Sequence, residues 1–402
     1  MFSKLVPVVS IVFVLLACVT PDSARIREVL DTDLVTFESG TVPDELVDTL
    51  SRRKVLLLGE THYVQEHQEF VLELLIRLHP HGLRLFAQEM PHAYGWIVDD
   101  YVTGERDNYP ESVRRMDEYW IEGLRAFNEG LPESERIRFS YIDMNHAHDA
   151  CLLSLSWMVR GTRIGESIGP LVVDVLETHP GTDGYIRALV DLEQRLASDR
   201  ARLEDTLGLR WYARLVEVVE IELRSIPVRE RFDNPVRERI MIDLANRAIE
   251  NAAGSSVALN VGMYHAQRRR YMGTRQEWLG EYLSANAERF GGSEQLYSVA
   301  FWGFSGERIR NFMDRNPEPV PEAMDRPTSN FARQIAEIVA RRDGTTRPES
   351  AAFIELSDPA FARSMQIAFS FSRLRAAPGR QFDAYLVFPE ISVLESIRRA
   401  WE

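Results

Sequence analysis

The feature that most constrains this chain is a repeated alternation of short β-rich runs with helical patterns. The run Val55 to Leu58 is followed by "QEHQEFVLELLIRLH", residues 65 to 79, in which apolar residues recur at the spacing of one helix face. Further β-rich runs lie at residues 83–90, 137–144, 255–265, 295–304 and 382–390. Strands separated by helices favour a parallel arrangement in which helices cover both faces. We therefore predict an α/β protein with a mostly parallel sheet flanked by helices.

The β-rich runs stop in the middle of the chain. Residues 151 to 232 contain long amphipathic stretches such as "ALVDLEQRLASDRARLEDTL" and "WYARLVEVVEIELRSI". This pattern predicts a helical insertion at about 151–232 within an α/β domain of residues 31–402. Residues 316–330, "NPEPVPEAMDRPTSN", are typical of a proline-rich surface loop.

The N-terminus has the pattern of an export signal. Residues 1–17, "MFSKLVPVVSIVFVLLA", carry one positive charge and then an apolar run too short for a permanent membrane span. The run closes on "LLAC", which resembles the lipobox of bacterial lipoproteins. The resemblance implies removal of a signal peptide of residues 1–17, acylation of Cys18 and a lipid-anchored tether at 18–30. The alternative is an ordinary signal peptide followed by a chance cysteine.

These N-terminal features predict an exported protein, anchored by lipid in the cell envelope. Val19 is not the aspartate that retains such lipoproteins in the inner membrane, so the analogy favours the outer membrane in a cell that has one. Loss of residues 1–17 removes one lysine and no acidic residue, which takes the formal net charge from −14 to −15. Such a charge argues against a nucleic-acid partner. Cys151 is then the one cysteine besides Cys18, so no intrachain disulfide is expected unless it involves Cys18.

Acidic and histidine side chains lie at the ends of several predicted strands. Glu60 and His62 follow the first β-rich run, Glu89 ends the second, Asp143 ends the third, and His265 follows the fourth. Ligands of open α/β sheets bind outside the carboxyl ends of the strands. Each residue alone is typical of a helix cap or a surface group, but their shared position indicates one common site.

Two further patterns support this site. The sequences "GETH" at 59–62 and "GMYH" at 262–265 place a histidine three residues after a glycine, which would allow a tight exit from the strand. In "DNPVRERIMIDLANRAIENA", Asn234 as N-cap puts Arg237 in the first helical turn, where the helix dipole disfavours a cation. Such an arginine is often held by a carboxylate or binds an anion. An exposed arginine paired with Asp233 or Glu238 is the alternative.

Six segments resemble, in order along the chain, the landmarks of one superfamily. They are "LLLGETHYVQEHQEF", "LRLFAQEMP", "FSYIDM", "PVRERIMIDLANRAIE", "VALNVGMYH" and "FDAYLVF". That superfamily joins erythromycin-esterase-like proteins, ChaN-like haem-binding lipoproteins and the Tiki/TraB metalloproteases. The likeness runs from about residue 50 to 390, with "GETH" and "EM" closest to the ChaN-like pattern. One departure is the spacing of Glu60 and His62, which are two residues apart where the esterase pattern has three.

The resemblance implies an active site of Glu60, His62, Glu89 and His265, with Arg237 nearby. Two hydrolytic mechanisms fit these residue types. In the first, His62, His265 and a carboxylate, Glu89 or Glu60, bind a divalent Zn, Mn or Co ion that activates water. In the second, which needs no metal, His62 is the general base and His265 or Arg237 stabilises the oxyanion. The expected substrate is a small molecule or a peptide, with an ester or peptide bond to be cleaved.

A ChaN-like haem- or iron-binding role without catalysis is the alternative function. Its axial ligands could come from Tyr63, Tyr264 or His67, or from His146 and His148 of "NHAHD". A third alternative is a substrate-binding protein whose site has lost its chemistry. The sequence does not indicate the oligomeric state.

Overall fold

The computed structural model describes residues 21–160, 162, 164–231, 233–270, 276–310, 320–324, 330–367 and 375–401. Its strands are β1 (Val35–Phe37), β2 (Val55–Glu60), β3 (Leu83–Pro91), β4 (Arg138–Asp143), β5 (Ser256–Gly262), β6 (Leu296–Arg310), β7 (Val320–Met324), β8 (Ala351–Glu355), β9 (Gln366–Ile367), β10 (Arg375–Ala376) and β11 (Ala384–Ile391). Its helices before the middle of the chain are α1 (Pro21–Asp33), α2 (Asp44–Leu50), α3 (Gln65–Leu78), α4 (Gly95–Val102) and α5 (Glu111–Asn128). The later helices are α6 (Ala150–Arg160), α7 (Gly165–Leu176), α8 (Asp183–Ser198), α9 (Arg200–Leu207), α10 (Leu209–Arg231), α11 (Asn234–Asn251), α12 (Met263–Ala266), α13 (Leu279–Ala285), α14 (Asn330–Asp343), α15 (Pro359–Arg363), α16 (Pro378–Gln381) and α17 (Glu395–Trp401).

The main sheet has the strand order β1-β8-β11-β6-β2-β5-β3-β4, with β7 paired to β6. The pairs from β11 across to β4 are all parallel, whereas β1, β8 and β7 are added in antiparallel pairs. The predicted α/β class with a mostly parallel sheet is confirmed. Parallel pairing brings the carboxyl ends of β2, β5, β3 and β4 to one edge.

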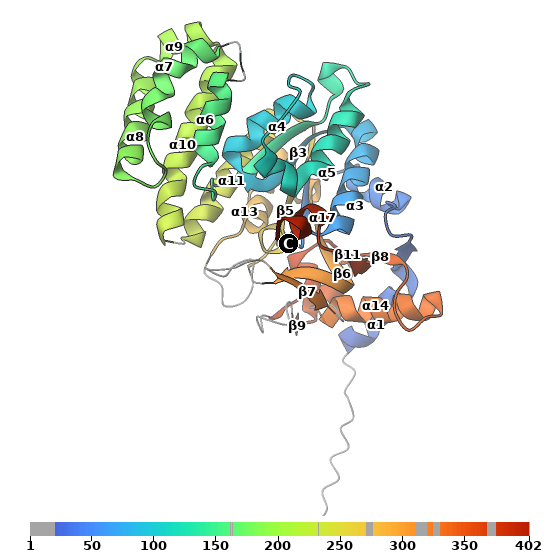
Figure 1. The fold of residues 1–402 in the computed structure, drawn as a ribbon. Coiled ribbons are helices and arrows are strands. Elements are labelled where there is room, and N and C mark those ends of the chain that lie inside the picture. The colour runs from blue at the N-terminus through green and yellow to red at the C-terminus, as the bar shows by residue number, and fades with distance from the viewer. Residues whose placement is uncertain are drawn as a thin grey trace, which may run out of the picture.

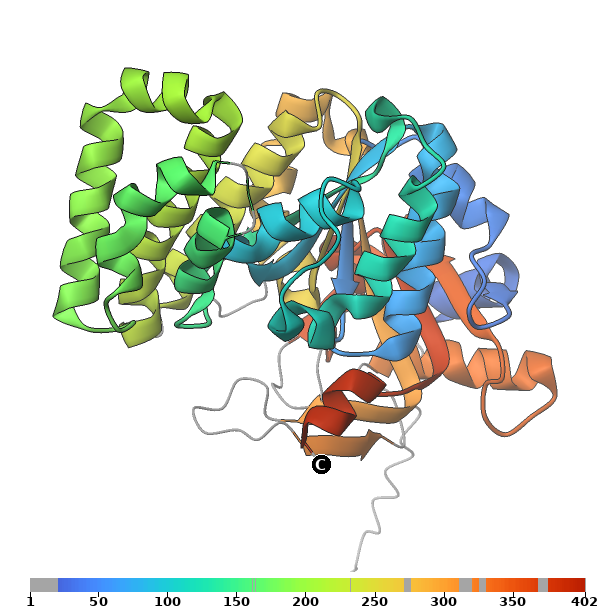
Figure 2. The ribbon, with the colours of Figure 1, turned by 45° about the horizontal axis from the view of Figure 1, so that its top comes forward.

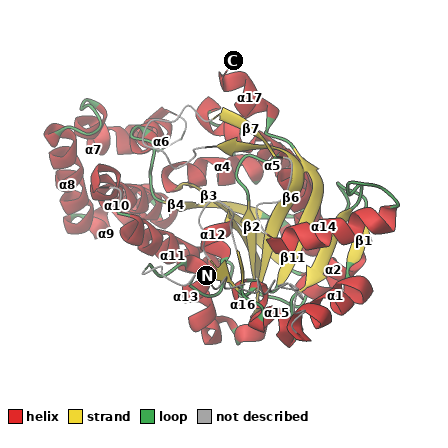
Figure 3. Cartoon of the chain, turned by 90° about the horizontal axis from the view of Figure 1, so that it is seen from below, coloured by secondary structure: helices red, strands yellow, loops and turns green. Residues whose placement is uncertain are grey.

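Helices cover both faces of this sheet (Figure 3), and the strand sequences explain why. Along β2, Leu56 and Leu58 face one apolar core together with α3, α4 and α5, while Val55 and Leu57 face a second core with α1, α11 and α14. Side chains that alternate between two buried faces require a continuous apolar run, which is what residues 55–58 provide.

Helices α6 to α10 occupy residues 150–231, the stretch in which the sequence predicts a helical insertion. They form a separate group of helices beside the β4 edge of the sheet (Figures 1 and 2). Buried polar contacts join this group to the body: the Asn145 side chain donates to Glu222 of α10 at 3.0 Å, and Arg229 of α10 donates to the backbone carbonyl of Asn145.

The described part of the chain begins with helix α1, in the stretch 18–30 that the sequence assigns to a tether. Helix α1 covers most of the stretch assigned to the tether, and it buries Ile26, Val29 and Leu30 in the second core. The predicted signal peptide and Cys18 lie outside the described residues. Within the described part of the chain, no helix has the length and apolar character needed to cross a membrane.

Two local predictions need correction. The predicted proline-rich loop contains strand β7, which pairs antiparallel with β6 as an edge strand, a position where proline is tolerated. The cap of α11 is Asp233, whose side chain accepts a hydrogen bond from Val236 N at 3.1 Å, and Asn234 is already helical.

Candidate active site

The structure brings together the five residues that the sequence singles out as catalytic. Glu60 is the last residue of β2, Glu89 lies near the end of β3, and His62 follows β2 directly. His265 lies in the short helix α12 after β5, and Arg237 lies in the first turns of α11. All five are placed at the carboxyl edge of the parallel strands, as the topology of an open α/β sheet requires.

The His62 ring is fixed by a carboxylate behind it. Its Nδ1–H donates to Glu60 Oε1 at 2.9 Å, and Glu60 Oε2 accepts from the Asn260 side chain at 2.8 Å. Asn260 also donates to Gln88 at 2.7 Å, since it pairs with Leu58 of β2 on one side and Gln88 of β3 on the other. The other ring nitrogen, Nε2, is on the side of Glu89, and the His62 side chain is 25% exposed.

The His265 ring has the same arrangement with a different carboxylate. Its Nδ1–H donates to Glu238 Oε2 at 2.7 Å, while Glu238 Oε1 accepts from Leu279 N at 2.6 Å. The Trp278 ring lies edge-on to the imidazole, with ring centroids 5.5 Å apart. Each histidine therefore has its Nδ1 committed to a buried acid and its Nε2 directed elsewhere.

Both Nε2 atoms face the same carboxylate, that of Glu89. His265 Nε2 lies 3.3 Å from Glu89 Oε1, and His62 Nε2 lies 4.0 Å from Glu89 Oε2. The 4.0 Å separation is too long for a direct hydrogen bond, but a water molecule can bridge such a pair. Glu89 is itself held by Arg237 Nη2 at 2.5 Å and by the backbone N–H of Gly262 at 2.6 Å.

Arg237 belongs to this network rather than to the surface. Its guanidinium donates to Asp143 through Nε at 3.0 Å and Nη2 at 2.6 Å, in addition to Glu89. Asp143 is fully buried, and its carboxylate also accepts from Met144 N at 2.7 Å. These two acids offset the unfavourable position of a cation in the first turns of α11.

The electrostatics of the site follow from this crowding of acids around two imidazoles. Burial alone would lower the pKa of His265, but Glu238 and Glu89 outweigh it and raise that pKa to about 10. Burial likewise disfavours protonated His62, yet the charge of Glu89 and the hydrogen bond to Glu60 raise its pKa. Burial would raise the pKa of Glu89, but His265, His62 and Arg237 hold it well below its usual value. At neutral pH His265 is therefore a cation that donates to ionised Glu89.

The two glycines of the repeated G-x-x-H pattern are needed for space, not for a left-handed turn. A Cβ on Gly59 would lie 2.9 Å from the Cβ of Ala266, so the glycine lets α12 pack against β2. Gly262 has a φ of −54°, which other residues adopt readily. A Cβ at Gly262 would lie 2.8 Å from His62 Nε2 and 3.3 Å from Glu89 Oε2. Gly262 thus keeps open the space between His62 and Glu89.

We expect Gly262→Ala to lower kcat by about 100-fold or more, because misplacement of reacting groups by about 1 Å has this effect. Turnover of a substrate by the two proteins measures it. The Gly254→Ala variant is unsuitable as a control because Gly254 has a φ of +86°, whereas Gly130→Ala has open space around the new Cβ. Full activity in Gly262→Ala would show that the space between His62 and Glu89 is not used.

The residues suggested as haem ligands are engaged in packing. The Tyr63 hydroxyl lies 3.9 Å from Met116 Sδ, and its ring packs against Val393 and Ile397. The Tyr264 ring lies beside that of Trp278, with centroids 5.6 Å apart. Nothing in these contacts tests haem binding, so the role of both tyrosines as axial ligands stays a prediction.

The histidines suggested for the same role are also placed differently. His67 is completely buried between Phe301 and Phe388, and burial lowers its pKa to about 3. His146 and His148 lie beyond the end of β4 at exposed positions, where His146 Nδ1 is 3.5 Å from Asp143. The role of these three histidines as haem ligands likewise stays a prediction.

The donor set His62, Glu89 and His265 does not fit a divalent metal. Both oxygens of Glu89 already accept hydrogen bonds, and one of the donors is the guanidinium cation of Arg237 at 2.5 Å. In the described part of the chain, no group of three or more His, Cys, Asp or Glu side chains is arranged to bind a metal ion. The sequence suggested a metal because it could not show that Arg237 donates a hydrogen bond to the Glu89 carboxylate.

Asn260, Gln88 and the role of Glu238 were not predicted from the sequence. Asn260 had a visible signal, since it is a polar residue in the otherwise apolar strand "VALNVG". Gln88 likewise interrupts an apolar run. Glu238 appeared only as a possible surface partner of Arg237, and the pattern could not show that its side chain is 1% exposed and turned toward His265.

Comparisons with solved structures support the fold. A succinoglycan biosynthesis protein superimposes with a TM-score of 0.65 at 11% identity, over 92% of this chain and 97% of that one. A Bacillus cereus protein gives 0.64 at 13% identity, over 92% and 98%. The erythromycin esterase EreC, as a mutant in its open conformation, gives 0.59 at 15% identity, over 90% and 98%.

The fold expected from the resemblance to erythromycin-esterase-like proteins is thus confirmed over most of the chain. The haem-bound ChaN of Campylobacter jejuni gives a TM-score of only 0.31 at 12% identity, over 73% of this chain and 98% of that one. No protein-family profile and no curated protein sequence matches the chain.

Proposed function

We propose that this protein is a metal-independent hydrolase that cleaves a carboxylic ester with water. The observation that carries the proposal is the pair of histidines, each held at Nδ1 by its own buried acid and each directing Nε2 toward Glu89. A carboxylate behind the imidazole fixes the ring and its tautomer, so that Nε2 can exchange a proton with a reacting group. The fold shared with an erythromycin esterase is compatible with this chemistry.

In the proposed reaction, His62 Nε2 takes a proton from a water molecule held in the space between His62 and Glu89. The resulting hydroxyl attacks the ester carbonyl and forms a tetrahedral oxyanion. The positive charge that develops on His62 is stabilised by Glu60 and Glu89, the same acids that raise its pKa. Protonated His265 donates through Nε2–H to the oxyanion or to the departing alkoxide, which leaves as an alcohol.

Arg237 has a positioning role in this mechanism. Its guanidinium is already bonded to Asp143 and Glu89, so it is committed to holding Glu89 between the two histidines. Of the two candidates for stabilising the oxyanion, we assign His265, because its Nε2–H has one longer contact, at 3.3 Å from Glu89, whereas Arg237 makes shorter hydrogen bonds to two acids. An ester is favoured over a peptide because an alkoxide needs less assistance to leave than an amine.

The test is hydrolysis of matched ester and peptide substrates by the chain from residue 19 onward. We expect turnover of esters and little turnover of peptides of the same acyl group. Turnover of peptides at equal rates would assign the site to a peptidase, and no turnover of either class by a folded protein would contradict a hydrolase.

The pH dependence of kcat/KM should be bell-shaped. The base His62 must be unprotonated, so the rate rises with pH through its raised pKa, above the ordinary value of about 6.5. His265 must be protonated, so the rate falls as the pH passes about 10. Because both rings contact Glu89, the two apparent pKa values of the profile belong to His62, Glu89 and His265 together and not to single residues. A rate–pH profile measures both limbs, and a rate that falls between pH 6 and 8 would contradict these roles.

We also propose that the chain is a lipoprotein anchored through Cys18, on the strength of the "LLAC" pattern. Globomycin should block its processing, and radiolabelled palmitate should be incorporated into the wild type but not into Cys18→Ala. Palmitate incorporation into Cys18→Ala equal to that of the wild type would contradict the anchor. This experiment is independent of the hydrolase proposal.

A further inference from the structure

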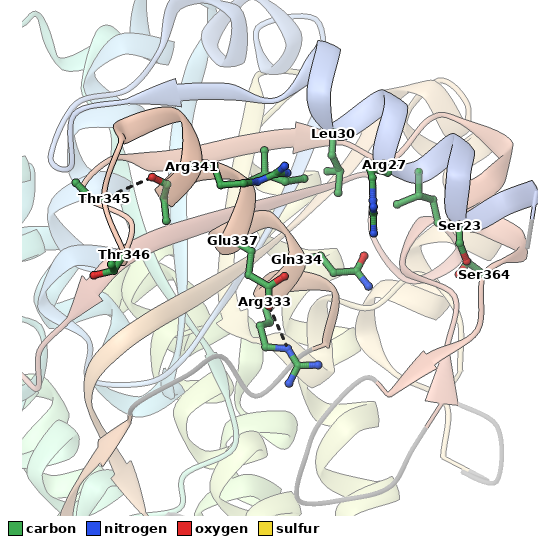
Figure 4. A pocket seen from close by; sticks show the side chains of 13 residues that line it. Ser23, Arg27, Leu30, Arg333, Gln334, Glu337, Arg341, Thr345, Thr346 and Ser364 are labelled. Carbon is green, nitrogen blue, oxygen red and sulfur yellow. Dashed lines mark hydrogen bonds and ion pairs between the residues drawn. The ribbon is translucent and has the colours of Figure 1, made fainter. Parts of the chain in front are cut away.

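Helices α1 and α14 enclose a groove that the hydrolase site does not use. The groove has a volume of about 670 Å³ and lies against the face of the sheet covered by the second core. Arg27 enters it from α1, and Arg333 and Arg341 enter it from α14 (Figure 4). Its other polar lining includes the hydroxyls of Ser23, Thr345, Thr346 and Ser364. We propose that this groove binds the phosphate of an anionic phospholipid headgroup.

The charges in the groove favour an anion. Three arginines line it, and Glu337 is the one acidic residue among its lining residues. Arg333 pairs with Glu337 at 3.9 Å, and Arg341 pairs with Asp31 at 3.7 Å, in both cases between substantially exposed side chains. Such long, exposed pairs stabilise little, so these arginines can turn to a phosphate. Guanidinium groups with nearby hydroxyls are typical phosphate donors.

The position of the groove favours a lipid as the source of that phosphate, and this step rests on the proposed anchor at Cys18. Helix α1 begins at Pro21, three residues after Cys18. Three residues of fully extended chain span at most about 10 Å. Arg27 lies six residues into the helix, about 9 Å further along its axis. An acylated Cys18 would therefore hold the groove within about 20 Å of the membrane surface. A net negative protein gains a local positive contact there, which would orient it on the bilayer.

The test uses the mature chain with Cys18→Ser, so that no acyl group contributes. We expect this protein to float with phosphatidylcholine vesicles that contain phosphatidylglycerol, and not with phosphatidylcholine alone. Binding should weaken with salt. Arg27→Gln, Arg333→Gln and Arg341→Gln combined should weaken it on the order of 100-fold, since each surface arginine contributes appreciably. Glu337→Gln, which removes the negative charge, should strengthen binding about fivefold.

The matched control removes the same charge from the exposed positions Arg187, Arg195 and Arg231, again to glutamine. It should bind vesicles within about threefold of the parent, since the charges lie outside the groove. Equal losses in both triple variants, or no vesicle binding by the parent, would overturn the proposal. Binding of inorganic phosphate without vesicle binding, lost in the groove variant, would reassign the groove to a soluble phosphate. Because these assays lack the acyl group and measure no hydrolysis, their failure is distinct from failure of the anchor or of the esterase.

Discussion

His62→Ala should lower kcat for ester hydrolysis by about 1,000-fold while leaving the fold intact. Removal of a positioned general base has an effect of this order. The His62 side chain is 25% exposed and lies at the carboxyl edge of the sheet, so its loss leaves no large cavity in either core. Steady-state kinetics of the two purified proteins measure the ratio. His81→Ala is the matched control, because His81 is exposed and precedes the amino end of β3, whereas the site lies at the carboxyl ends of the strands.

A second variant separates catalysis from packing at the same place. Glu60→Gln keeps the shape of the side chain but removes the charge that supports protonated His62. It should lower the pKa of the rising limb of the pH profile, because one of the groups that raises the pKa of His62 is lost. A His62→Ala variant with more than a tenth of the wild-type kcat, or a Glu60→Gln profile identical to that of the wild type, would show that His62 is not the base.

Glu89→Gln should lower the free energy of unfolding by about 3–5 kcal/mol, because removal of one partner leaves buried charges uncompensated. Glu89 is 7% exposed and contacts both Arg237 and His265. Asp143 still neutralises Arg237 in the variant, which places the expected value at the lower end of this range. Urea unfolding at neutral pH measures the difference, with the exposed Glu193→Gln as control.

The same difference should depend on pH with a definite sign. The pKa of Glu89 is lower in the folded protein than in the unfolded chain, so its contribution is fully present above the unfolded value of about 4.3. The contribution is lost as the pH falls through the lowered folded pKa. The stability gap between wild type and Glu89→Gln should therefore narrow in acid. A gap below 1 kcal/mol at neutral pH would show that the carboxylate does not hold this network together.

The strand ends were predictable because their physical signals are local. A run such as residues 55–58 can be apolar at every position only where both faces are covered, and the polar residues that follow it must lie at an edge. Parallel pairing then brings Glu60, Glu89 and His265 together without further information. The separation of the helical stretch at 150–231 follows from the change in periodicity.

The rest depended on contacts that no local pattern contains. The sequence could not show that Arg237 donates to Glu89 and Asp143, and without this contact Glu89 was predicted as a metal ligand. It could not show that Gly262 faces His62, so the glycine was explained by backbone freedom instead of space. The helix boundary at Asp233 was missed by one residue, which is the usual uncertainty at a helix terminus.

The most direct test of the metal-independent site is ester turnover by wild-type protein and His62→Ala after chelator treatment, with metal content and the haem absorbance measured on the same samples. We expect the wild type to retain its full turnover with metal far below one ion per chain and no Soret band, and His62→Ala to lack this activity. Turnover that disappears with chelation and returns on addition of Zn, Mn or Co would contradict the account. A stoichiometric Soret band without turnover would instead assign the protein to haem binding.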